Sequence, residues 1–277
     1  MAIAARASWT ENAPSKGWRL LHLRELWEYR ELVYFLALRD IQAQYKQAAF
    51  GIAWAVVQPL AGVLLFTVVF AKLAHVSSEG IPYPVFALVG YLVWTYFSST
   101  ITTAATSIVT NAHLMTKIYF PRVAAPLSAL LPGFISLAPG LVLLAVLMVI
   151  EGAGTTVALV ALPLCLVWMV VVSLGFSLLF AAVNVKYRDV GTVISTLTQL
   201  WLFACPVAYP SSLVTGGWRW LYFANPVVGL IDSFRWCLVG TPFPGAEVAV
   251  SAATTLLVFG IGVAYFARTE RQFADIV

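Results

Sequence analysis

Two groups of residues in this chain could carry out chemistry, and both lie in apolar surroundings. The segment 98–107 holds seven serines and threonines among ten residues, and the segment 111–122 reads NAHLMTKIYFPR. Hydroxyl side chains could line a polar path, but small hydroxyl residues are also ordinary packing material between helices in lipid. A loop with two cations between long uncharged stretches is typical of a connector on the cytosolic side of a membrane.

Residues of the types used in catalysis and metal binding form no recognisable constellation. The three histidines lie in separate predicted loops or faces, and the three cysteines form no CxxC pair: His22, His75, His113, Cys165, Cys205 and Cys237. A bridge between Cys205 and Cys237 is conceivable, but buried free thiols are favoured. We expect no metal site on this chain.

The sequence also argues against an ATPase and against an ion-coupled carrier. No stretch matches GxxxxGK[ST], the loop that cradles nucleotide phosphates, so this chain should not hydrolyse ATP itself. Acidic residues fall near the ends of the predicted spans, whereas ion-coupled carriers usually need one within the bilayer. No inverted repeat is evident either. The pattern predicts passage of a substrate rather than catalysis, with no cofactor.

The composition places these segments in a membrane protein. Hydrophobic residues make up 61% of the 277 and charged residues only 10%, whereas soluble domains carry about 25%. Because a spanning helix needs roughly 20 apolar residues, the long uncharged gaps predict an all-α protein with six transmembrane helices. They cover about 50–72, 85–108 and 122–149, a fourth helix ending near 183, a fifth from 191 to about 205–210, and 248–267.

The charges also predict how the chain is oriented. If residues 1–48 are cytosolic and the spans alternate, 13 of the 16 lysines and arginines lie inside and three outside, as the positive-inside rule requires. This distribution explains the net charge of +4 without a nucleic-acid partner. We expect a cytosolic segment 1–48, a six-span domain 49–267 and a cytosolic tail 268–277.

Two segments flanking the spans are predicted to lie along the membrane or dip into it. Residues 20–38 have helical periodicity with a ridge of Arg24, Glu28 and Glu31. Such a helix can lie along the inner leaflet or pack on the cytosolic surface of the protein. Residues 211–246 are interrupted by prolines and glycines and rich in aromatics, which suits one or two short helices dipping into the outer leaflet.

Seven motifs, in order from residue 39 onward, resemble the permease subunit of ABC exporters for O-antigen and related cell-surface polysaccharides. They are RDIQAQYKQAAFGIAWAVVQPL (39–60), GIPYPVFALVGYLVWTYFSS (80–99), NAHLMTKIYFPR (111–122), NVKYRDV (184–190), QLWLFACPVAYP (199–210), NPVVGLIDSFRW (225–236) and RTERQFADIV (268–277). AAF at 48–50 departs mildly from the family pattern, and the first 20 residues match nothing.

The resemblance implies a homodimer in the bacterial cytoplasmic (inner) membrane that binds two copies of a separate ATPase. ATP and Mg would then sit on the partner chain. The cargo would be a polysaccharide on an undecaprenyl-type lipid, moved through a channel at the dimer interface. Other ABC cargoes, such as teichoic acid or capsule, remain open, as does an ATP-independent lipid-linked sugar flippase or a membrane transferase.

The resemblance also assigns roles to particular residues. The segment 111–122 corresponds to a coupling helix seated in the ATPase, with Tyr119 and Phe120 as an apolar knob. The coupling-loop residues are Asn111, His113, Lys117, Tyr119, Phe120, Pro121 and Arg122. The region 20–38 corresponds to a gate helix at the cytosolic entrance, with Leu23, Leu26, Trp27, Glu28 and Glu31.

Aromatic rings could line the path of the sugar, because their flat apolar faces suit the C–H surfaces of pyranose rings. The candidates for this lining are Trp54, Trp94, Tyr96, Phe97, Trp201 and Phe203. Anchoring at the membrane interface is an equally good explanation for each single residue.

Overall fold

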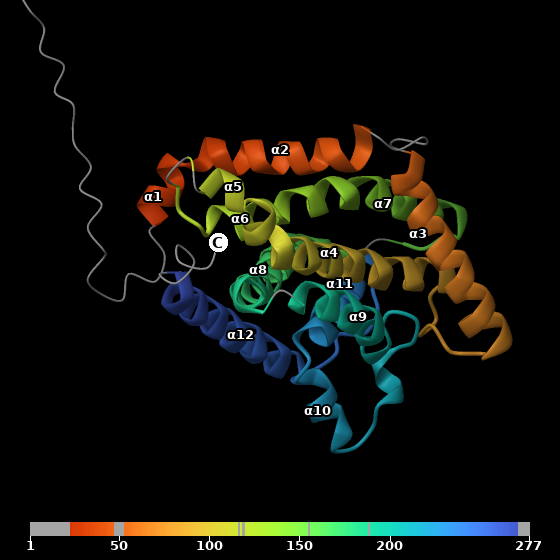
Figure 1. Ribbon diagram of the computed structural model, residues 1–277. Coiled ribbons are helices and arrows are strands. Elements are labelled where there is room, and N and C mark those ends of the chain that lie inside the picture. The colour runs from red at the N-terminus through yellow and green to blue at the C-terminus, as the bar shows by residue number, and fades with distance from the viewer. Residues whose placement is uncertain are drawn as a thin grey trace, which may run out of the picture.

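The computed structural model describes residues 23–46, 53–115, 117, 120–154, 156–187 and 189–270. Every regular element within these ranges is helical, and the long helices pack side by side (Figure 1). Five helical segments are long and apolar enough to cross a membrane. They are Ala53–Leu73, Tyr83–Thr110, Ala124–Ile150, Val157–Lys186 and Val248–Thr269. The prediction of an all-α membrane protein is therefore confirmed.

Three of these segments are built from two consecutive helical pieces. The first is α3 (Ala53–Phe66) followed by a π-helical turn, η1 (Thr67–Leu73). The third joins α6 (Ala124–Ser128) to α7 (Leu130–Ile150), and the fourth joins η2 (Val157–Ala161) to α8 (Leu162–Lys186). The others are single helices, α4 (Tyr83–Thr110) and α12 (Val248–Thr269).

The predicted fifth span is present as a shorter apolar helix. α9 (Val190–Trp201) has 12 residues and continues for three more as η3 (Leu202–Ala204). Cys205 then has extended backbone angles, as expected for the residue before Pro206. The described chain therefore contains five helices of spanning length rather than six, because a proline ends this one early.

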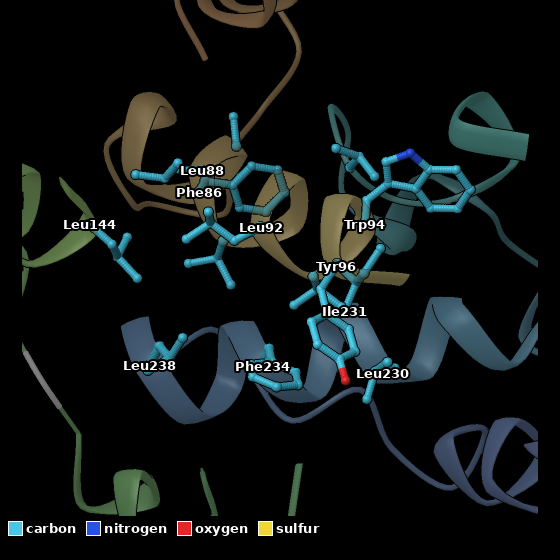
Figure 2. Close-up of a cluster of buried hydrophobic side chains, with 14 of the residues drawn as sticks. Phe86, Leu88, Leu92, Trp94, Tyr96, Leu144, Leu230, Ile231, Phe234 and Leu238 are labelled. Atoms are coloured by element: carbon cyan, nitrogen blue, oxygen red, sulfur yellow. The ribbon is translucent and has the colours of Figure 1, made fainter. Parts of the chain in front are cut away.

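The centre of the fold is α4, which contacts α8, α7, α11 (Pro226–Val239), α3 and α9. Phe86, Phe97 and Ile101 of α4 are completely buried. Figure 2 shows Phe86 and Leu92 of α4 among side chains from α7 and α11, in the largest hydrophobic cluster of the described chain. A helix buried on nearly all sides is a rigid support for side chains that project from it.

A close contact between backbones joins α8 to α12. A Cβ placed on Gly262 would lie 2.2 Å from the carbonyl oxygen of Gly175, and a Cβ on Gly175 would lie 2.8 Å from Cα of Phe259. Neither glycine can therefore be replaced without moving a helix. Small residues at helix contacts are how membrane helices gain van der Waals contact where no hydrophobic force drives association.

The region 211–246 contains the expected short helices, but one of them is buried. η4 (Ser211–Leu213) and α10 (Trp218–Phe223) precede α11. The α11 helix begins at Asn225, whose side chain accepts from the Val227 amide, and ends at Gly240 with φ +75°. Thirteen of its 14 residues are buried. Phe234 of this helix and Phe223 of α10 are buried, whereas Trp218 and Trp220 are exposed.

The predicted amphipathic helix is divided at Tyr29 into α1 (Leu23–Glu28) and α2 (Arg30–Lys46). Val33, Leu36 and Ala37 are buried, and α2 contacts α6 and α7. One face of the helix thus packs on the protein itself. Its other side exposes aromatic rings at Trp27, Tyr34 and Phe35.

Candidate functional site

A cleft of about 450 Å³ opens between α3, α4, α7 and α9. Its wall is formed by 18 residues, and eight of them are serine or threonine. The lining residues are Trp54, Ala55, Gln58, Pro59, Tyr91, Leu92, Thr95, Tyr96, Ser98, Ser99, Thr102, Thr103, Gly133, Ser136, Leu137, Ser195, Thr198 and Gln199. A smaller cavity of about 90 Å³ shares Ser99, Thr103, Gly133 and Ser136 with it.

The hydroxyl run of α4 divides between the two roles considered above. Ser98, Ser99, Thr102 and Thr103 line the cleft. Thr100 and Ser107 are buried among helices, where Ser107 donates to the carbonyl of Ala104 at 2.7 Å. One helix therefore supplies both a polar wall and packing contacts, since residues three or four positions apart share a face.

The predicted lining aromatics lie in three different places. Trp54 and Tyr96 form part of the cleft wall. Trp94, Phe97 and Trp201 pack against one another, and Phe97 and Trp201 also pack edge to face on Phe176, with ring centroids 5.1–6.3 Å apart. The ring of Phe203 is exposed and absent from the lining. The sequence did not single out Tyr91 of the wall.

Most of the cleft hydroxyls already donate their proton within their own helix. Thr95 donates to the carbonyl of Tyr91 at 2.8 Å, and Thr102 donates to Ser98 at 2.7 Å. Ser98 and Ser99 of α4 and Ser195 and Thr198 of α9 donate three residues back in the same way. A hydroxyl whose proton is used keeps its lone pairs, so the wall presents mainly acceptors to the cleft.

Gly133 at the floor of the cleft keeps the wall in this shape. A Cβ there would lie 2.8 Å from the ring of Tyr96 and 2.9 Å from Oγ1 of Thr100. Any larger residue would displace the tyrosine ring. The close approach of α7 to α4 therefore depends on this glycine.

The loop 111–122 begins at a buried asparagine. Asn111 is the C-cap of α4, and its Nδ2 donates to the carbonyl of Ser107 at 2.7 Å. Its Oδ1 accepts from Nη1 of Arg39, at 2.7 Å, and Arg39 also forms an ion pair with Asp40 at 2.7 Å. The start of the loop is thus bonded to α2.

The middle of the loop separates into exposed and buried side chains. The short helix α5 (Ala112–Met115) presents His113 to solvent, and Lys117 is exposed as well. Phe120 is only 5% exposed, because it packs on Val33 of α2 and Ala124 of α6. Phe120 is therefore held inside the protein, whereas the resemblance implied an apolar knob for the ATPase. Its partner in that prediction, Tyr119, lies outside the described residues.

The end of the loop is bonded to α12. Nη1 of Arg122 donates to the carbonyl oxygen of Glu270, at the C-terminal end of that helix. Pro121 is buried, and its carbonyl accepts from the Ala124 amide at 2.9 Å, which begins α6. The loop is therefore held by α2 at one end and by α12 at the other.

A buried ion pair on α11 was missed by the sequence analysis. Arg235 is 1% exposed, and its Nη1 lies 3.7 Å from Oδ1 of Asp232. Its Nη2 donates to the carbonyl of Val207 at 2.8 Å, and its guanidinium lies 3.6 Å from the ring centroid of Phe86. These contacts bind α11 to α4 and to the 205–210 loop. Two opposite charges three residues apart in the apolar run PVVGLIDSFRW were the available signal.

A second ion pair joins α10 to the start of α12. Nε of Arg219 lies 2.8 Å from Oε1 of Glu247, the N-cap residue of α12. The pKa of the Glu247 carboxyl is lowered. The main cause is a hydrogen bond from its own backbone amide, and the hydrogen bond and positive charge of Arg219 lower it further. The pair stabilises the turn that leads into the last long helix.

Comparison with known proteins places these features in a family. The family described as ABC-2 type transporter matches residues 31–239. The chain is 30% identical over 260 residues to the O-antigen export system permease protein RfbA of Myxococcus xanthus. The matched region covers 92% of this chain and 98% of that protein.

More distant relatives span similar lengths. RfbA of Klebsiella pneumoniae is 25% identical over 248 residues, 89% of this chain and 95% of that protein. The polysialic acid transport protein KpsM of Escherichia coli is 26% identical over 245 residues, 85% of this chain and 92% of that protein. The chain belongs to the ABC-2 type transporter family, as a transmembrane permease subunit.

Proposed function

We propose that this chain is the permease of an exporter that moves a lipid-linked polysaccharide across the bacterial inner membrane. It acts as a pair of identical chains, and two copies of a separate ATPase supply the energy. The observation that carries the proposal is the cleft of about 450 Å³ with a hydroxyl and amide wall between membrane helices. The comparisons with O-antigen export permeases support the same cargo class.

The cleft is the part of the chain that contacts the polymer. Sugars bind through many weak hydrogen bonds and through contacts with ring faces, and this wall offers acceptor hydroxyls together with Trp54, Tyr91 and Tyr96. Weak contacts at many positions suit a polymer that must slide. In the paired protein two such clefts face one another, and the lipid carrier stays in the bilayer.

The loop 111–122 receives force from the ATPase. Its exposed side chains, His113 and Lys117, provide the docking surface, and its two clamped ends connect it to α2 and α12. The helices α1 and α2 form a gate at the cytosolic entrance, with Trp27, Tyr34 and Phe35 against the inner leaflet.

The membrane is crossed six times, with α9 and η3 as the short fifth crossing. Thirteen of the 16 cationic side chains fall on one side in that arrangement, and both termini are then cytosolic. Five crossings would place the termini on opposite sides. In this arrangement α10 and α11 form the outer region 211–246, the six-span domain is 49–267, and 1–48 and 268–277 are cytosolic.

The test is to replace the Walker lysine of the partner ATPase in cells that carry this permease. We expect the membrane level of the permease to be unchanged and the polymer to stay inside the cell. Normal appearance of polymer at the surface would contradict the proposal. Activity of the purified chain in vesicles without an ATPase would instead identify an ATP-independent flippase, the alternative from another class.

A further inference from the structure

The described residues of the cleft wall include no side chain that is charged at neutral pH. Twelve of its 18 residues are polar, but all twelve are serine, threonine, tyrosine or glutamine. No aspartate, glutamate, lysine, arginine or histidine is part of the wall in the described ranges. A polymer in this cleft is thus surrounded by neutral dipoles and apolar groups.

The direction of the hydrogen bonds in the wall adds a second constraint. Six of the eight serine and threonine hydroxyls donate to a carbonyl of their own helix: Thr95, Ser98, Ser99, Thr102, Ser195 and Thr198. Their free lone pairs accept from a donor. The amides of Gln58 and Gln199 can donate to a guest, but they carry no positive charge.

An uncharged sugar fits these constraints, and an acidic sugar does not. The hydroxyls of a neutral pyranose donate to the lone pairs of the wall. A carboxylate has only acceptor atoms, so it meets the same lone pairs without a cation to balance its charge. Burying an unpaired charge among neutral groups is strongly unfavourable, and the penalty recurs with each acidic unit of a polymer.

We propose that the cleft selects an uncharged polysaccharide and excludes a polyanionic one. The inference rests on the proposed export function and narrows its cargo class. It separates this chain from the polysialic acid transport protein KpsM, whose named cargo carries one carboxylate per sugar.

The experiment uses vesicles that contain the permease together with its partner ATPase. The two probes are a lipid-linked neutral polymannan and a lipid-linked polysialic acid of matched length. We expect ATP-dependent transfer of the polymannan at least tenfold faster than that of the polysialic acid. Similar rates, or faster polysialic acid, would overturn the selectivity and leave the export function standing. Movement of neither polymer would overturn the export function itself.

A pair of matched variants assigns the selectivity to the cleft. Thr102→Val with Thr103→Val removes two wall hydroxyls at nearly constant shape, and Thr106→Val removes one on the same helix that is not part of the wall. The double variant should slow polymannan transfer severalfold, whereas T106V should match the wild type. Equal rates for all three proteins would show that the cleft is not where the polymer is recognised.

Installing a cation provides the converse test. A lysine at Thr103 places a positive charge in the wall, so we expect T103K to raise the polysialic acid rate relative to the polymannan rate at least tenfold. The ratio of the two rates within one preparation cancels differences in the amount of folded protein. An unchanged ratio would contradict the electrostatic basis of the selectivity.

Discussion

Nη1 of Arg39 lies 2.7 Å from Oδ1 of Asn111, and this bond joins the middle of α2 to the C-terminal end of α4. Asn111 is 3% exposed and uses its other amide atom to hold the carbonyl of Ser107. We expect this contact to transmit a displacement of the loop 111–122 to α2, so that the proposed gate and the proposed coupling loop move together.

A double-mutant cycle measures how much this bond contributes. Arg39→Ala and Asn111→Ala should each lower the amount of polymer exported per ATP hydrolysed, and the double variant should be no worse than either. The expected coupling energy is about 1 kcal/mol, because a hydrogen bond to a charged group contributes roughly 1.5–3 kcal/mol net and the partial exposure of this arginine lowers that value. Gln42→Ala is the control, because Gln42 is an exposed residue of the same helix, three positions beyond Arg39. Additive single effects would exclude the link.

Phe120 and Lys117 should separate stability from docking within one loop. Because Phe120 is buried against Val33 and Ala124, Phe120→Ala should destabilise the protein by about 3 kcal/mol and lower its melting temperature in detergent. Lys117 is exposed, so Lys117→Ala should leave the melting temperature unchanged and reduce co-purification of the ATPase. If Phe120→Ala instead reduced co-purification of the ATPase and left the melting temperature unchanged, Phe120 would belong to the docking surface.

The contact between α8 and α12 can be tested with two glycines on one helix. Gly262→Ala places a methyl group 2.2 Å from the carbonyl of Gly175 and must push the helices apart, whereas a Cβ on Gly260 meets nothing within 4 Å. We expect G262A to lower the melting temperature. G260A should not lower it, since alanine is a better helix former than glycine. Equal behaviour of the two variants would contradict the close packing.

The Arg219–Glu247 pair predicts a component of stability that depends on pH. The pKa of Glu247 is lowered in the folded protein, so the stabilisation is fully present above the unfolded pKa and is lost as the pH falls through the folded pKa. Both side chains are partly exposed, so solvent screening limits the contribution to about 0.5–1 kcal/mol.

Melting curves of the wild type and Glu247→Gln between pH 7 and pH 3 check this expectation. The difference in melting temperature should shrink as the pH falls below the ordinary glutamate range. A difference that does not change with pH would mean that the carboxylate charge makes no contribution.

The long helices could be predicted because lipid requires long uncharged stretches, which sequence gaps reveal directly. The fifth predicted span ends close to where the sequence placed it, because η3 stops just before Cys205–Pro206. Burial of α11 was harder to foresee, because Asp232 and Arg235 make it too polar for a span. The two charges form an ion pair, and the guanidinium of Arg235 also donates to the carbonyl of Val207, 28 residues earlier in the chain.

Only the part of the site that has a local sequence pattern could be predicted. The hydroxyl run of α4 marked one wall, but the residues that complete the cleft come from α3, α7 and α9, and no local pattern connects them. The aromatic candidates had equivalent sequence contexts. Only the tertiary structure distinguishes Tyr96, which lines the cleft, from Phe97, whose ring lies 5.4 Å from that of Trp201. Likewise, no local pattern predicts the burial of Phe120, because the contact with Val33 of α2 forms only in the folded protein.

The central claim is that the polymer passes along the cleft between α3, α4, α7 and α9. A photo-crosslinking amino acid at position 102, in cells whose partner ATPase is stalled by replacement of its Walker lysine, tests it directly. Thr102 lines the cleft, and Leu257 of α12 is 61% exposed and absent from the wall. We predict a polysaccharide adduct at position 102 and none at position 257. No adduct at 102, or equal adducts at both positions, would contradict the account.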